Sequence, residues 1–134
     1  MTANPLLALE ALGQSVWLDY IRRHLITSGE LTRLVEQDGL GGVTSNPSIF
    51  EKAIAGSTDY TGALAAAGRR APCATTDLYE SLAIADIQDA ADLLRGVYER
   101  AGRRDGYVSL EVSPLLAHDT AGTIAEARRL WAEL

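Results

Sequence analysis

Polar side chains stand near the ends of three predicted strands, and their types suit proton-transfer chemistry. Asp19 lies near the end of the first predicted strand, which is mostly apolar. Thr44 and Asn46 occupy alternate positions at the end of the second strand, and Ser109 and Glu111 do so in the third. If these stretches are parallel strands of one barrel-like sheet, their carboxyl ends lie together and the side chains converge on one cavity. Two carboxylates, hydroxyls and an amide in such a cavity favour acid–base catalysis, because carboxylates can take up and return protons.

Each of these residues also has a structural interpretation, which the sequence alone leaves open. Asp19 could be a strand-end carboxylate that accepts a hydrogen bond from a loop. Thr44 and Asn46 suit helix capping, and Asn46 could equally present a helix N-terminus to a phosphate. Glu111 is harder to explain structurally, because a glutamate between valines and leucine is costly to bury unless it is paired or hydrated.

The dozen residues from 41 to 52 combine a strand, a polar turn and a helix start. Gly41 and Gly42 allow the backbone to bend or another group to approach closely. Asn46 is a good N-cap and Pro47 fits the first helical position. We expect the helix that follows to end near Gly56.

Strands and helices alternate along the chain, which predicts an α/β fold built from parallel β/α units. Trp17 and Trp131 are expected in the core, and Asp86 is expected to restart the long helix that begins near residue 76. A complete (β/α)₈ barrel needs eight strands and about 250 residues, so three parallel strands would be part of one, and a free-standing three-stranded layer is the alternative. The predicted strands are residues 15–21, 41–45 and 107–112; the predicted helices are residues 5–12, one turn within 22–26, 28–38, 47–56, 60–67, 76–101 and 120–134.

Composition limits the partners and the compartment. The 134 residues form one modest domain, and their formal net charge of −6 argues against nucleic acid or an anionic membrane as the main partner. Cys73 is the one cysteine, so no intrachain disulfide can form, and neither a signal peptide nor a membrane span is recognisable. We therefore expect a cytoplasmic protein. His24 and His118 lack the spacing of metal ligands, so no metal site is expected.

Three sequence blocks resemble transaldolases in order and spacing. Residues 42–50 read GVTSNPSIF and continue as EKAI, residues 16–21 read VWLDYI before them, and residues 106–114 read GYVSLEVSP after them. The last block runs into LAHDT at residues 116–120. Leu115 departs from the pattern, since many relatives would have a polar or basic residue there, and it leaves the loop after the third strand less well assigned. The resemblance covers nearly all of this chain but only the N-terminal part of such an enzyme.

The resemblance implies that residues 1–134 are the first three β/α units of a (β/α)₈ barrel, with extra helices before the first strand and between the second and third. It implies a cofactor-free and metal-free enzyme that transfers a dihydroxyacetone unit between sugar phosphates through a lysine Schiff base. By motif, Asp19 matches the acid–base aspartate and Glu111 the glutamate that moves protons through a water. Thr44 and Asn46 match residues that orient water and substrate hydroxyls.

The Schiff-base lysine is expected beyond Leu134, in a Lys-Ile-Pro-like motif on the next strand. Lys52 is the one lysine in the chain, and it is expected on a helix rather than at a strand end. The chain by itself is therefore expected to be inactive and, with an open barrel edge, to self-associate. The alternative is a short, inactive product that acts as an interaction module or persists as a relic; the lack of a helix cap at Leu134 favours truncation instead.

Overall fold

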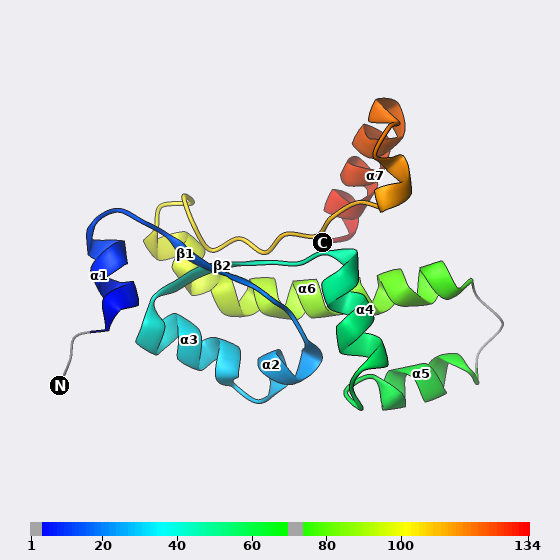
Figure 1. Cartoon of the computed structure of the whole chain (residues 1–134), viewed down its shortest axis with the longest axis horizontal. Helices are drawn as coiled ribbons and strands as arrows, with labels where there is room; N and C mark the ends of the chain where they lie inside the picture. The colour runs from blue at the N-terminus through cyan, green and yellow to red at the C-terminus, as the bar shows by residue number, and fades with distance from the viewer. Residues whose placement is uncertain (1–3, 70–73) are drawn as a thin grey trace.

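The computed structural model describes residues 4–69 and 74–134 (Figure 1). Cys73 therefore lies outside the described residues. The element order alternates helices with two strands, much as the sequence pattern predicts. The elements are α1 (Pro5–Ala11), β1 (Val16–Asp19), α2 (Arg23–Thr27), α3 (Glu30–Asp38), β2 (Leu40–Thr44), α4 (Pro47–Ala55), α5 (Thr61–Ala67), α6 (Thr75–Arg100), a 3₁₀ turn (Pro114–Leu116) and α7 (Thr120–Glu133).

β1 and β2 pair in parallel, and their register places Leu18 beside Val43 and Asp19 beside Thr44. The two strands therefore end together, as expected for neighbouring β/α units. Their inward-facing side chains meet the long helix α6, while Asp19 lies on the exposed face. This alternation follows from the two-residue period of a strand.

The predicted third strand is not formed as a strand. Residues 107–109 run alongside β2 and pair with it through a single parallel bridge between Val43 and Val108. The Val43 N–H donates to the Tyr107 carbonyl at 3.0 Å, and the Ser109 N–H donates to the Val43 carbonyl at 2.9 Å. Beyond this point the Ser45 N–H donates to the Ser109 Oγ and the Ser45 Oγ donates to the Ser109 carbonyl, so side chains take the place of the next backbone hydrogen bond of the ladder. The structure thus has a two-stranded sheet and one bridged segment, and the predicted count of three β/α units is not confirmed by it.

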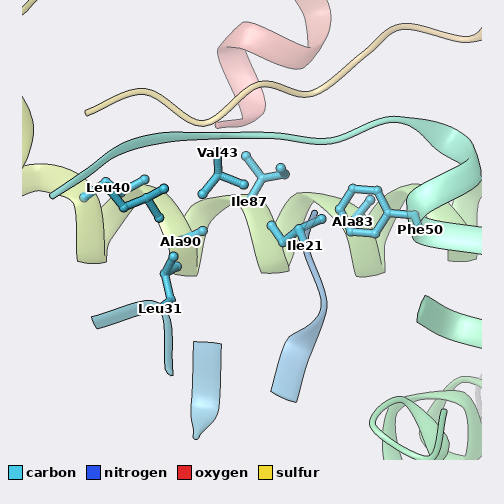
Figure 2. Close-up of a cluster of buried hydrophobic side chains, with 9 residues drawn as sticks. Ile21, Leu31, Leu40, Val43, Phe50, Ala83, Ile87 and Ala90 are labelled. Carbon is cyan, nitrogen blue, oxygen red and sulfur yellow. The ribbon is translucent and has the colours of Figure 1, made fainter. Parts of the chain in front are cut away.

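The core lies between the sheet and helices α3, α4 and α6 (Figure 2). Val43 from β2 and Phe50 from α4 pack with Ile87 and Ala90 of α6, and each of these is almost fully buried. α6 is alanine-rich along this face, which lets the sheet approach its backbone closely. The full cluster comprises Ile21, Leu31, Leu40, Val43, Phe50, Ala83, Ile87, Ala90 and Leu94.

Two further expectations are corrected by the structure. Asp86 does not restart a helix, because α6 runs unbroken through it and its carboxylate accepts from side chains instead of capping backbone N–H groups. Trp131 is not in the core but is 79% exposed on α7, and Trp17 is 38% exposed. Figure 1 shows α7 standing away from the sheet and meeting the rest of the chain mainly near its C-terminal end. There the Gln88 side chain donates to the Glu133 carbonyl at 2.7 Å.

Candidate active site

Asp19 and Thr44 form a hydrogen-bonded pair at the carboxyl ends of the two strands. The Thr44 Oγ1 donates to the Asp19 Oδ1 at 2.8 Å. Each residue is the last of its strand, and the parallel register sets them side by side. The hydroxyl orients the carboxylate and leaves its second oxygen available to a substrate. The sequence-based expectation that these side chains converge is confirmed for this pair.

Asn46 lies two residues beyond Thr44 and caps α4. Its Oδ1 accepts from the Ile49 N–H at 2.9 Å, and Pro47 occupies the first helical position. The capping interpretation is therefore confirmed. It does not exclude a second role, because the side-chain Nδ2 makes no hydrogen bond within residues 4–69 and 74–134 and can still donate to a ligand.

Ser109 ties the third segment to the end of β2. The buried Ser45 donates from its Oγ to the Ser109 carbonyl at 2.6 Å, and the Ser45 N–H donates to the Ser109 Oγ at 3.3 Å. These contacts position the segment that leads to Glu111. Ser109 is thus engaged in holding the backbone, a role the strand pattern did not predict.

Glu111 lies on the third segment, beside a crevice that Pro47 of α4 also lines. This crevice of about 450 Å³ lies between α6 and α7, and Glu111 lines it together with Tyr79, Glu80 and Arg129. Burial, followed by the negative charges of Glu111 and Glu80, raises the pKa of the Tyr79 phenol. Among the described residues, no hydrogen bond joins Glu111 to Asp19, Thr44 or Asn46. The convergence of Asp19 and Glu111 on one cavity therefore stays a prediction.

Lys52 lies on α4, where the sequence pattern placed it. It is exposed and belongs to the last turn of that helix. The catalytic position implied for an imine-forming lysine is a strand end, so Lys52 does not occupy it.

A network of charged residues that sequence reasoning missed fixes the chain just beyond β1. Arg22 binds Asp59 through two hydrogen bonds, of 2.7 and 3.0 Å. The Arg22 guanidinium holds the pKa of the Asp59 carboxyl well below its usual range, at about 2, and the His24 N–H also donates to this carboxylate at 3.0 Å. The exit of β1 is thereby attached to the start of α5.

The second part of this network is buried. Arg23 pairs with Asp86 at 2.7 Å, and the Tyr60 hydroxyl donates to the same carboxylate at 2.7 Å. The Arg23 guanidinium also lies 4.7 Å from the centre of the Tyr60 ring. Burial raises the pKa of the Asp86 carboxyl, although the hydrogen bonds from Tyr60 and Arg23 act to lower it. No sequence spacing predicted these contacts, because they join residues 26 and 63 positions apart.

Two other kinds of feature, a metal-binding cluster and a membrane-spanning helix, are absent from the described part of the chain. Residues 4–69 and 74–134 contain no group of three or more His, Cys, Asp or Glu side chains arranged to hold a metal ion. Across the same residues, every helix is too short or too polar to span a membrane.

Comparison with known proteins identifies the family. The profile described as transaldolase/fructose-6-phosphate aldolase matches residues 16–134. Transaldolase 2 of Nostoc punctiforme is 52% identical over 134 residues, which is 100% of this chain and 35% of that protein. The transaldolase of Thiobacillus denitrificans is 53% identical over 120 residues, covering 90% of this chain and 33% of that protein. Transaldolase 1 of Streptomyces coelicolor is 47% identical over 129 residues, covering 96% and 34%.

This chain belongs to the transaldolase/fructose-6-phosphate aldolase family, which confirms the resemblance seen in its three sequence blocks. It spans about a third of the length of the curated relatives it matches. The family implies a (β/α)₈ barrel, and a two-stranded parallel sheet covered by helices is consistent with part of one.

Proposed function

We propose that residues 1–134 supply one wall of a transaldolase active site. The observation that carries this proposal is the Asp19–Thr44 pair at the ends of two adjacent parallel strands, in a chain of this family. The reaction moves a dihydroxyacetone unit from a ketose phosphate, such as sedoheptulose 7-phosphate, to an aldose phosphate, such as glyceraldehyde 3-phosphate. The products of that exchange are erythrose 4-phosphate and fructose 6-phosphate.

In the proposed mechanism a lysine amine adds to the ketose carbonyl and water leaves, giving an imine. Asp19 then takes the proton from the C4 hydroxyl while the C3–C4 bond breaks, and the electrons of that bond pass into the imine to form an enamine. The aldose phosphate product departs. The enamine carbon attacks the acceptor aldehyde, Asp19 returns its proton to the new hydroxyl, and water hydrolyses the imine.

Thr44 and Asn46 orient the groups on which Asp19 acts. The hydroxyl of Thr44 holds one carboxylate oxygen of Asp19, which leaves the other directed to the sugar. The Nδ2 of Asn46, on the half-buried turn before α4, donates to a substrate hydroxyl. Both residues stand where the carboxyl ends of barrel strands form active sites.

Glu111 is the proposed proton shuttle for imine formation and hydrolysis, acting through a water. Val108 and Leu110 pack against the core, so Ser109 and Glu111 would alternate to the opposite face if the third segment were fully paired. A neighbouring fourth strand would supply that pairing. We therefore propose that Glu111 turns from the α6–α7 crevice to the site when the rest of the barrel is present.

The imine-forming lysine is proposed to lie in sequence beyond Leu134, because the exposed helical position of Lys52 does not suit that role. The alternative function is an interaction module without catalysis. The two are separated by kinetics on the full-length protein that contains this sequence. Asp19→Asn is expected to reduce turnover about 100-fold or more while substrate still forms a borohydride-trapped adduct. Equal turnover in the variant and the parent would contradict the role of Asp19, and the absence of any adduct in the parent would favour the interaction module.

A further inference from the structure

Trp17 lies next to the Asp19–Thr44 pair, on the side of the amino ends of the strands. Trp17 and Asp19 are alternate residues of β1, so their side chains project from the same face. The strand register pairs Trp17 with Gly42 and Asp19 with Thr44. The Trp17–Gly42 layer is therefore one step closer to the amino ends of the strands than the layer that carries the proposed chemistry.

The indole of Trp17 covers Gly42. A Cβ atom on Gly42 would lie 2.5 Å from the Cδ2 and Cε2 atoms of Trp17, which is a severe overlap. A glycine is therefore required at position 42 for the indole ring to lie across β2. The interiors of parallel barrels are filled by layers of side chains. In this layer the indole of Trp17, from β1, also covers the position of Gly42 in β2, which has no side chain.

Hydrogen bonds among Trp17, Ser15 and Asp105, together called the latch, hold the edge of the indole that carries Nε1. The Trp17 Nε1 donates to the Asp105 Oδ1 at 2.9 Å and lies 2.8 Å from the Ser15 Oγ. Ser15 in turn donates to Asp105. A side chain on Gly41 would overlap both the Ser15 hydroxyl and the Asp105 carboxylate, so the second glycine of the pair is explained by the same contact.

Asp105 immediately precedes the segment that leads to Glu111. The Gly106 N–H donates to the Gly41 carbonyl at 2.7 Å, which starts the alignment of this segment with β2. Gly106 has a φ of +84°, and a side chain there would overlap the backbone of Tyr98 at the end of α6. The latch therefore joins β1, β2 and the third segment on the face that carries Asp19.

We propose that Trp17 and Asp105 are positioning residues of the active site. They hold the start of the third segment against β2. They thereby fix the position of Ser109 and Glu111 along the strand direction relative to Asp19. The indole closes the sugar cavity on the side of the amino ends of the strands. The functional part of this proposal rests on the transaldolase function proposed above. The latch itself is a property of the 134-residue chain and can be tested without activity.

The latch is tested by NMR on the ¹⁵N-labelled 134-residue chain, which has two indole N–H resonances. Asp105→Ala is expected to shift the Trp17 resonance upfield and to speed its exchange with solvent, while the Trp131 resonance stays in place as the internal control. Trp131→Phe assigns the two peaks. A Trp17 resonance that does not move in Asp105→Ala would overturn the latch.

The positioning role is tested in the full-length protein by comparing Trp17→Phe with Trp131→Phe. Trp17→Phe keeps a ring over Gly42 and removes the N–H donor. Because misplacement of catalytic groups by about 1 Å can cost up to 10²-fold, we expect kcat per borohydride-trapped site to fall about tenfold with KM nearly unchanged. Trp131→Phe is expected to match the parent. Equal kcat per trapped site in the two variants would overturn the positioning role, whereas failure of the parent to trap sugar would count against the proposed function alone.

Discussion

At the scale of single residues, most of the candidate site could be predicted from local sequence. Asn46 and Pro47 specify a helix start, and Thr44 follows Gly41–Gly42 at strand spacing, so the structure confirms these positions. What the sequence could not reveal is the pairing of Asp86 with Arg23 and Tyr60. That contact depends on tertiary packing, and Asp86 looks like any helix-starting aspartate until the fold is known.

Asn46 combines a capping role with a proposed substrate contact, and two variants separate them. Asn46→Asp keeps the capping oxygen but loses the Nδ2 donor, so it should retain stability and lose activity. Asn46→Ala loses the cap too and should be less stable by about 1 kcal/mol. Urea unfolding of the 134-residue chain measures the change in stability, and turnover of the full-length protein measures the change in activity. Full activity in Asn46→Asp would show that the amide does not contact the sugar.

Asp86 should dominate the stability of the region around the β1 exit. Its carboxylate is fully buried and accepts from Arg23 and Tyr60, so Asp86→Ala leaves a guanidinium without its partner. We expect a loss of about 3 kcal/mol in the free energy of unfolding. The control is Asp92→Ala on the same helix, whose ion pair with Arg95 is exposed and should contribute little. Similar urea midpoints for the two variants would contradict a structural role for the buried pair.

At the scale of elements, boundaries set by local signals and the parallel pairing of β1 with β2 were predicted well, whereas the extent of the third strand was not. The start of α4 at Pro47 and the end of α6 near Arg100 follow from a cap, a proline and a glycine-rich turn. The predicted third strand is not formed as a strand, because strand structure depends on backbone hydrogen bonds to a neighbouring strand. Residues 107–109 find β2 on one side, and beyond Ser109 the hydrogen bonds to it end.

The ion pair that attaches α5 to the β1 exit should make stability depend on pH in the acid range. The pKa of Asp59 is about 2 in the folded chain, below its ordinary value of 3.8. The folded state therefore binds this proton less readily than the unfolded state. The contribution is complete above about pH 4 and is lost as the pH falls through about 2. Urea unfolding across this window should show a smaller loss in Asp59→Asn than in the parent, and parallel curves would contradict the assignment.

At the scale of the whole molecule, the part of the chain that the structure describes exposes several large apolar side chains. Leu115 is 92% exposed and Trp131 79% exposed, and Ile124 and Leu134 add to the apolar surface of α7. Exposed apolar patches of this kind commonly mark interfaces or sites of aggregation. The arrangement is consistent with one part of a larger α/β layer.

We expect this surface to drive self-association of the 134-residue chain. Sedimentation should give an average mass that rises with protein concentration above 14.3 kDa. Trp131→Glu is expected to reduce the association, because it places a charge in the apolar surface. Ala132→Glu adds the same charge at the neighbouring exposed position and serves as the control. A concentration-independent monomer mass for the parent would contradict the expectation.

The most direct test of the central claim is the intact mass of the native protein from its source, before and after treatment with fructose 6-phosphate and borohydride. The transaldolase interpretation predicts a starting mass well above 14.3 kDa and a gain of one reduced dihydroxyacetone unit. Peptide mapping should place that unit on a lysine beyond Leu134. A native mass equal to that of this chain with no adduct, or an adduct on Lys52, would contradict it.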